Sequence, residues 1–169
     1  NLVLLPKDWL RLMLTGEAVS DMSDASGTLW LDVARRDWSD QLLAATGLSR
    51  HHMPRLVEGS ERSACVKAEL CTRWGLPSEL PVAGGAGDNA ASAVGMGLVR
   101  PGQGFVSLGT SGVVFVSGAA FEPDPPRALH AFCHALPGRW HQMSVMLSAA
   151  SALTWAAKNL GFADEPALL

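Results

Sequence analysis

In the first half of the chain, polar and apolar positions mix as they do in amphipathic helices with one solvated face. Residues 6–15 have a proline in the first turn and Gly16 just past the end, which predicts a helix over this range. Similar signals predict a short helix from a Ser39 cap to Ala45 and another helix over 67–74. Alternating apolar positions over 29–33 predict a strand.

From Pro81 onward the pattern changes to short apolar stretches between glycine turns. Residues 80–83 predict a strand that runs into Gly84-Gly85-Ala86-Gly87, and the small side chains over 89–96 predict a helix opened by Asp88. Charged residues become rare in the same region. Between Pro81 and Phe121 only Asp88 and Arg100 are charged, which is typical of buried strands.

The last third of the chain has the pattern of an antiparallel sheet followed by a helix. Residues 104–108 and 112–116 flank a three-residue tip and predict a hairpin. Two further strands are predicted over 129–135 and 140–146. A final helix is predicted from a Ser148 cap to Leu160, because Gly161 follows as a stop signal.

This order of elements indicates pieces of two α/β domains that join near Pro101 and Gly102, with residues 1–100 in one and residues 101–169 in the other. The chain opens on Asn1 without a leader and closes on apolar residues soon after a helical pattern. We therefore expect it to be an internal piece of a longer protein.

Composition excludes several classes of protein. At 169 residues and 48% hydrophobic content, the chain has enough material for a core, so disorder is excluded. A net charge of −3 argues against a nucleic-acid partner, and no apolar run reaches the ~20 residues of a membrane span. The three cysteines lack zinc or disulfide spacing, and we expect a reducing, cytoplasmic setting.

Two segments are candidates for chemistry. The first is the glycine run that ends at Asp88 and Asn89, where a backbone can approach a ligand closely and a helix begins. The Rossmann and Walker fingerprints are both missing. On the residues alone, Asp88 is either a functional carboxylate or simply the cap of its helix.

The second segment is the hairpin tip Gly109-Thr110-Ser111, whose N–H and O–H groups can face phosphate oxygens. The alternative is an ordinary tight turn. The histidines at 130, 134 and 141 allow a metal site, but solvated or core-edge histidines are favoured. Five aromatic residues are expected in the core: Trp9, Trp30, Trp38, Trp74 and Phe105.

Five separated motifs, in this order, resemble the FGGY carbohydrate kinases. They are Asp24–Val33, Gly87–Ala91, Ser107–Gly112, Phe132–Pro137 and Met143–Ala150. The resemblance runs from about Lys7 to the end of the chain. One departure is visible at Ala86, where the family usually has a third consecutive glycine. Five motifs in order are far more specific than any one of them.

The resemblance implies the actin-like ATPase, ribonuclease-H-like fold, which is an α/β architecture. Residues 1–100 would then form the C-terminal part of the N-terminal, sugar-binding domain, and residues 101–169 the N-terminal part of the C-terminal, nucleotide-binding domain. By the same resemblance Asp88 is the catalytic base and also contacts the substrate, as does Asn89. Gly109, Thr110 and Ser111 would bind the ATP phosphates.

The same resemblance implies ATP with Mg²⁺, and no metal ligand is assigned within this chain. The residues after the Gly-Asp pair favour D-xylulose as substrate and D-xylulose 5-phosphate as product. A homodimer in the cytoplasm is also expected, with no nucleic-acid or membrane partner. The chain by itself is expected to be inactive. The alternatives are another sugar or polyol kinase of the family, and a non-catalytic sugar- or nucleotide-binding module of the same fold.

Overall fold

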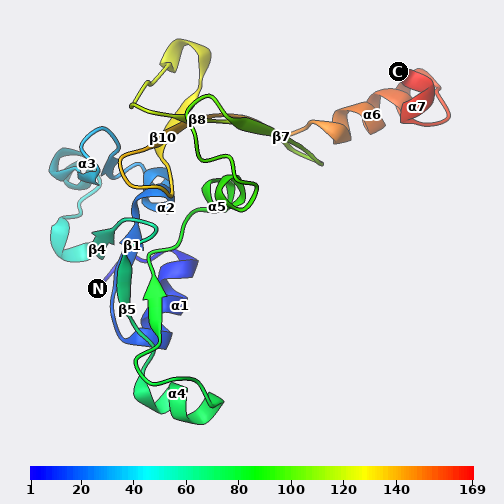
Figure 1. Cartoon of the computed structure of the whole chain (residues 1–169). Helices are drawn as coiled ribbons and strands as arrows, with labels where there is room; N and C mark the ends of the chain where they lie inside the picture. Colours follow the sequence, from blue (N-terminus) through cyan, green and yellow to red (C-terminus); the bar gives the residue numbers. More distant parts are fainter.

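The computed structural model describes residues 1–169 (Figure 1). Residues 1–100 are called the first part of the chain below, and residues 101–169 the second part. The first part combines short helices with three two-stranded sheets, β1–β4, β2–β3 and β5–β6, of which only β1–β4 is parallel. Its elements are α1 (Pro6–Thr15), β1 (Val19–Asp21), α2 (Met22–Ala25), η1 (Ser26–Thr28), β2 (Leu31–Asp32), β3 (Asp37–Trp38), α3 (Asp40–Ala45), η2 (Arg50–His52), β4 (Arg55–Val57), β5 (Arg62–Cys65), α4 (Ala68–Trp74), β6 (Pro81–Ala83) and α5 (Asp88–Gly95).

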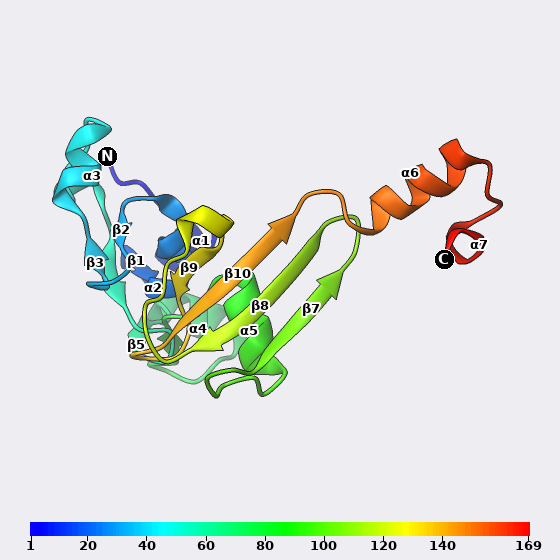
Figure 2. The same ribbon diagram turned by 90° about the horizontal axis from the view of Figure 1, so that it is seen from above.

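The second part is one antiparallel sheet with the strand order β7–β8–β10–β9, followed by two helices. Its hairpin is long and narrow, and the tip points toward α6, away from the first part (Figure 2). Both views place α5 beneath this sheet. The elements are β7 (Gly104–Leu108), β8 (Gly112–Gly118), η3 (Pro125–Arg127), β9 (His130–Cys133), β10 (Trp140–Met146), α6 (Ala150–Leu160) and α7 (Glu165–Leu168).

Several predicted elements are confirmed. Helix α1 has its proline in the first turn and ends at Gly16, which adopts φ 85° and donates its amide to Leu12. Ser39 caps α3 by accepting the Leu42 amide at 3.3 Å. The hairpin pairs Leu108 with Gly112 around the predicted tip. These elements are predictable because each depends on signals close together in the sequence.

Other predictions are wrong. Residues 29–33 form only the short strand β2, because Leu29 adopts φ 66° after the η1 turn and leaves the extended conformation. Ser148 does not cap α6. The helix begins after Ala149, and the amides of Ala149 and Ala150 donate to carbonyl oxygens of the hairpin tip. Helix α7 was not predicted.

The aromatic residues expected in the core do not all lie there. Trp38 is buried, and Trp30 and Phe105 are partly buried, but Trp9 and Trp74 are each 52% exposed. The main apolar cluster draws on both parts of the chain, because Cys133 of β9 packs with first-part residues. Its buried members are Ala25, Leu31, Trp38, Leu43, Met53 and Cys133. No helix is long and apolar enough to span a membrane.

Candidate active site

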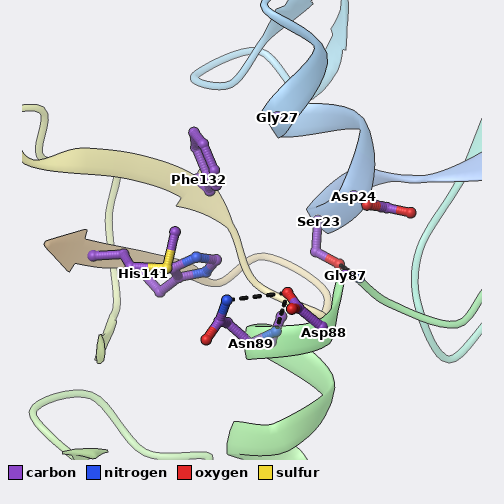
Figure 3. Close-up of a pocket in the computed structure, with 10 residues that line it drawn as sticks. Ser23, Asp24, Gly27, Gly87, Asp88, Asn89, Phe132 and His141 are labelled. Atoms are coloured by element: carbon purple, nitrogen blue, oxygen red, sulfur yellow. Dashed lines mark hydrogen bonds between the residues drawn. The ribbon is translucent and has the colours of Figure 1, made fainter. Parts of the chain in front are cut away.

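Asp88 is the first residue of α5, and its carboxylate does not cap the helix. Gly87 occupies the cap position, so the interpretation of Asp88 as a helix cap is wrong. Its Oδ1 accepts from the backbone amide of Asn89 at 2.7 Å and from the Asn89 side-chain amide at 3.0 Å (Figure 3). Asp88 is exposed and pairs with no lysine or arginine. The carboxylate is therefore available to a ligand.

A pocket in front of Asp88 is built from both parts of the chain (Figure 3). Helices α2 and α5 form one side, and strands β9 and β10 form the other. The lining residues are Ser23, Asp24, Gly27, Gly87, Asp88, Asn89, Ala90, Phe132, His141 and Met143. Asp88 and Asn89 also border a wider groove between α5 and β7, which reaches Ser107. Asp88 thus lies where the pocket and the groove meet.

The glycine corner before Asp88, residues 84–87, is held at each end by a hydrogen bond to a residue much earlier in the chain. Arg11, which is buried, donates to the carbonyl oxygen of Gly84 and to that of Val19. Ser23 accepts the amide of Gly87 at 3.0 Å. A Cβ at position 84 would overlap the carbonyl oxygen of Glu58, so glycine is required there.

Ala86, which stands where the family usually has a glycine, is compatible with the backbone conformation of this corner. Gly85 adopts φ +77°, which favours glycine, but Ala86 is not among the residues with positive φ. An alanine at position 86 therefore does not strain the backbone that leads to Asp88.

A partly buried ionic cluster lies next to the corner. The Lys7 ammonium is 2.7 Å from Asp21, 3.0 Å from Asp8 and 3.6 Å from Asp24. Burial alone would lower the pKa of Lys7, but the hydrogen bonds and charges of Asp21 and Asp8 outweigh it and raise that pKa. Burial raises the pKa of Asp24, against the opposing charge of Lys7. Figure 3 shows the Asp24 carboxylate turned away from Asp88.

Two of the histidines are buried, and not solvated or at the edge of the core as favoured above. His134 and His141 are buried around Phe115, and their ring centroids are 5.9 Å apart. Burial lowers the pKa of His141 to about 3, so its ring is neutral near pH 7. The Nδ1 atom of His141 is buried without a hydrogen-bond partner. No group of three or more His, Cys, Asp or Glu side chains is arranged to hold a metal ion.

The hairpin tip keeps only some of its donors free. The Gly109 amide donates to the carbonyl of Ser111, and the Ser111 hydroxyl donates to the carbonyl of Leu147. The amide and hydroxyl of Thr110 and the amide of Ser111 make no hydrogen bond within the chain. Of the three predicted phosphate-binding residues, Thr110 therefore offers the most unused donors.

The two predicted sites are not in contact. Asp88 begins α5 in the first part of the chain, whereas the tip lies at the far end of the hairpin (Figure 2). Val106 and Ser107 border both the groove next to Asp88 and a second pocket along the hairpin, but none of the three tip residues lines either of them.

Sequence reasoning did not single out Ser23, Asp24, Phe132 or Met143 as site residues, and it considered His141 only as a possible metal ligand. Asp24, Phe132 and Met143 lie within the motifs that carry the family resemblance, Ser23 lies one residue before the first motif, and His141 lies between the last two. No spacing in the sequence indicates that these segments meet at one pocket.

Solved structures define the class of this fold. The crystal structure described as a xyloylose kinase from Brucella ovis is 61% identical and superposes with a TM-score of 0.93, covering 99% of this chain and 34% of that one. The xylulose kinase structure from Rhodospirillum rubrum is 32% identical with a TM-score of 0.80, covering 90% and 31%. The chain thus has the actin-like ATPase, ribonuclease-H-like fold of sugar kinases.

Sequence comparison then gives the family. Residues 1–95 match the N-terminal domain of the FGGY family of carbohydrate kinases, and the chain belongs to this family. The xylulose kinase of Klebsiella pneumoniae is 60% identical over 167 residues, which is 99% of this chain and 34% of that protein. The chain therefore spans about a third of the length of its relatives.

Proposed function

We propose that the chain is part of an enzyme that transfers the γ-phosphoryl group of ATP to a hydroxyl of D-xylulose, giving D-xylulose 5-phosphate. The observation that carries the proposal is the place of Asp88. Its carboxylate lies, without a cationic partner, between a pocket built from both parts of the chain and the groove along β7. The relatives at about 60% identity, which are named xylulose kinases, support the choice of sugar.

In this proposal Asp88 accepts the proton of the sugar hydroxyl that attacks the γ-phosphorus. Phosphoryl transfer depends mainly on in-line positioning and charge stabilisation, so one oriented base beside the hydroxyl is the main chemical group required here. The Nδ2 atom of Asn89 donates a hydrogen bond to Asp88. The side-chain oxygen of Asn89 is therefore free to accept a hydrogen bond from a second sugar hydroxyl. Thr110 then donates to phosphate oxygens, together with the amides of the tip.

Mg²⁺ enters this proposal only as the ion carried by ATP. Mg²⁺ keeps several waters and binds substrate phosphates with one or two carboxylates, so it requires no dedicated protein cage. This chain holds no group of three ligating side chains, and we assign none of its residues to the ion.

Residues 1–100 are proposed as part of the sugar-binding domain and residues 101–169 as part of the nucleotide-binding domain. A homodimer and a cytoplasmic location are further predictions. They are checked by sedimentation of the purified full-length protein and by fractionation of cells that express it.

The test is a coupled assay of ADP release by the full-length protein with D-xylulose, D-ribulose, glycerol and gluconate in parallel. We expect turnover with D-xylulose to exceed that with the other three. Preference for another of these compounds would favour a different sugar or polyol kinase. Binding of D-xylulose by calorimetry without any ADP release would favour a non-catalytic module.

A further inference from the structure

Ser23 links the backbone next to Asp88 to a buried carboxylate. Its hydroxyl oxygen accepts the amide of Gly87 at 3.0 Å and donates its proton to Asp21 at 2.5 Å. Ser23 is 5% exposed and Asp21 is fully buried, so water does not compete for these bonds. Figure 3 shows the Ser23 side chain directed at Gly87.

The direction of this chain of hydrogen bonds is fixed. An ionised carboxylate only accepts, so the single proton of the Ser23 hydroxyl goes to Asp21 and its lone pairs face Gly87. Asp21 is held by the amides of Ser23 and Asp24, at 2.9 and 3.2 Å, and by the Lys7 ammonium at 2.7 Å. The hydroxyl of Ser23 is therefore held in one orientation by groups that are themselves fixed.

Asp88 has no comparable restraint of its own. Its carboxylate is bonded only to Asn89, the next residue of the same helix. The position of the carboxylate therefore depends on how the backbone enters α5 at Gly87. Of the bonds that hold the glycine corner, the one from Ser23 lies nearest to Asp88, since Arg11 holds the opposite end at Gly84.

We propose that Ser23 is a positioning residue that sets the Asp88 carboxylate in line for proton transfer by holding the Gly87 amide. The proposal rests on the function proposed above, in which Asp88 is the base. A displacement of about 1 Å at a reacting group can reduce a rate by about 100-fold. Loss of the Ser23 hydroxyl should therefore reduce kcat more than it changes KM.

The experiment compares Ser23→Ala, Asp88→Asn and the double variant in the full-length protein, with kcat and KM measured for D-xylulose and ATP. Ser63→Ala is the matched control, because Ser63 is equally buried and bonds the carbonyl of Val82, away from Asp88. All assays run well below the lowest melting temperature, so that loss of folded protein does not enter the rates.

We expect Ser23→Ala to lower kcat by about 10- to 100-fold, with the KM for ATP within about twofold. Ser63→Ala should leave both constants near wild type. In the Asp88→Asn background, Ser23→Ala should lower kcat no further, because residues that act as a unit are not additive. If Ser23 had a purely structural role, Ser23→Ala would lower kcat in the Asp88→Asn background as well.

The outcomes separate the two proposals. If Asp88→Asn keeps near-normal turnover, the proposed base is wrong, whatever Ser23 does. If Asp88→Asn is impaired but Ser23→Ala is unchanged, or the two losses multiply in the double variant, the positioning role of Ser23 is overturned while the base remains.

Discussion

The indole nitrogen of Trp140 donates to the carbonyl oxygen of Val33 at 2.9 Å, and this bond joins β10 of the second part to the first part. Arg36 reinforces the junction, because its guanidinium lies 5.1 Å from the centroid of the Trp140 ring and donates to the carbonyl of Arg139. One end of the sheet is thus fixed to the first part. The hairpin tip, which carries Thr110, lies at the other end (Figure 2).

Replacing Trp140 with phenylalanine should weaken this junction. The variant keeps an aromatic ring but removes the donor to Val33, and a typical hydrogen bond of this kind contributes about 0.5–1.5 kcal/mol. Urea unfolding of the full-length protein measures the loss. Trp155→Phe is the control, because Trp155 is 67% exposed. Equal stability of the two variants would contradict the role of the indole bond.

Asp88→Asn tests the base directly. Asparagine retains an oxygen that can accept the Asn89 amide, and Asp88 does not cap its helix, so stability should change by less than about 1 kcal/mol. An amide cannot take up a proton, and loss of a general base lowers kcat by about 10²- to 10⁴-fold. A folded variant that keeps near-normal kcat would refute this role.

The features that the sequence could predict are those that depend on residues close together in the chain. The hairpin around Gly109-Thr110-Ser111 and the cap at Ser39 depend on neighbouring residues, and both are confirmed. The pocket beside Asp88 joins α2, α5 and β10, and no local pattern specifies that contact.

The start of α6 shows the same limit. Ser148 has the right chemistry for a cap, but the amides of Ala149 and Ala150 bond the hairpin tip, which lies about forty residues earlier in the chain. A tertiary contact therefore replaces the local cap. Asp88 could be singled out through its motif, whereas the bond from Gly87 to Ser23 is revealed only by the folded structure.

Thr110→Val tests the phosphate role of the hairpin tip. Valine keeps the shape of threonine and removes a hydroxyl that makes no bond within the chain, so the fold should not change. Loss of one preorganised donor to the transferring phosphate should raise the barrier by about 2.7–4 kcal/mol, seen as a lower kcat. The control is Thr72→Val on α4, an exposed position away from the tip, where the hydroxyl bonds only the carbonyl of Ala68 in its own helix. Unchanged kcat and ATP affinity for Thr110→Val would make the tip an ordinary turn.

The buried ring of His141 should make stability depend on pH. Burial lowers its pKa in the folded state to about 3, against about 6.5 in an unfolded chain, so between these values the unfolded state binds the extra proton. Stability is therefore greatest above pH 6.5 and falls as the pH drops toward 3. His141→Phe removes this proton and keeps a ring that can stack on Phe115, as His141 does at 4.3 Å. Between pH 7 and pH 5 the wild type should lose about 2 kcal/mol more than this variant in urea unfolding. His130→Phe, at an exposed position, is the control. If wild type and His141→Phe lose the same stability over this interval, then His141 is not buried as a neutral ring.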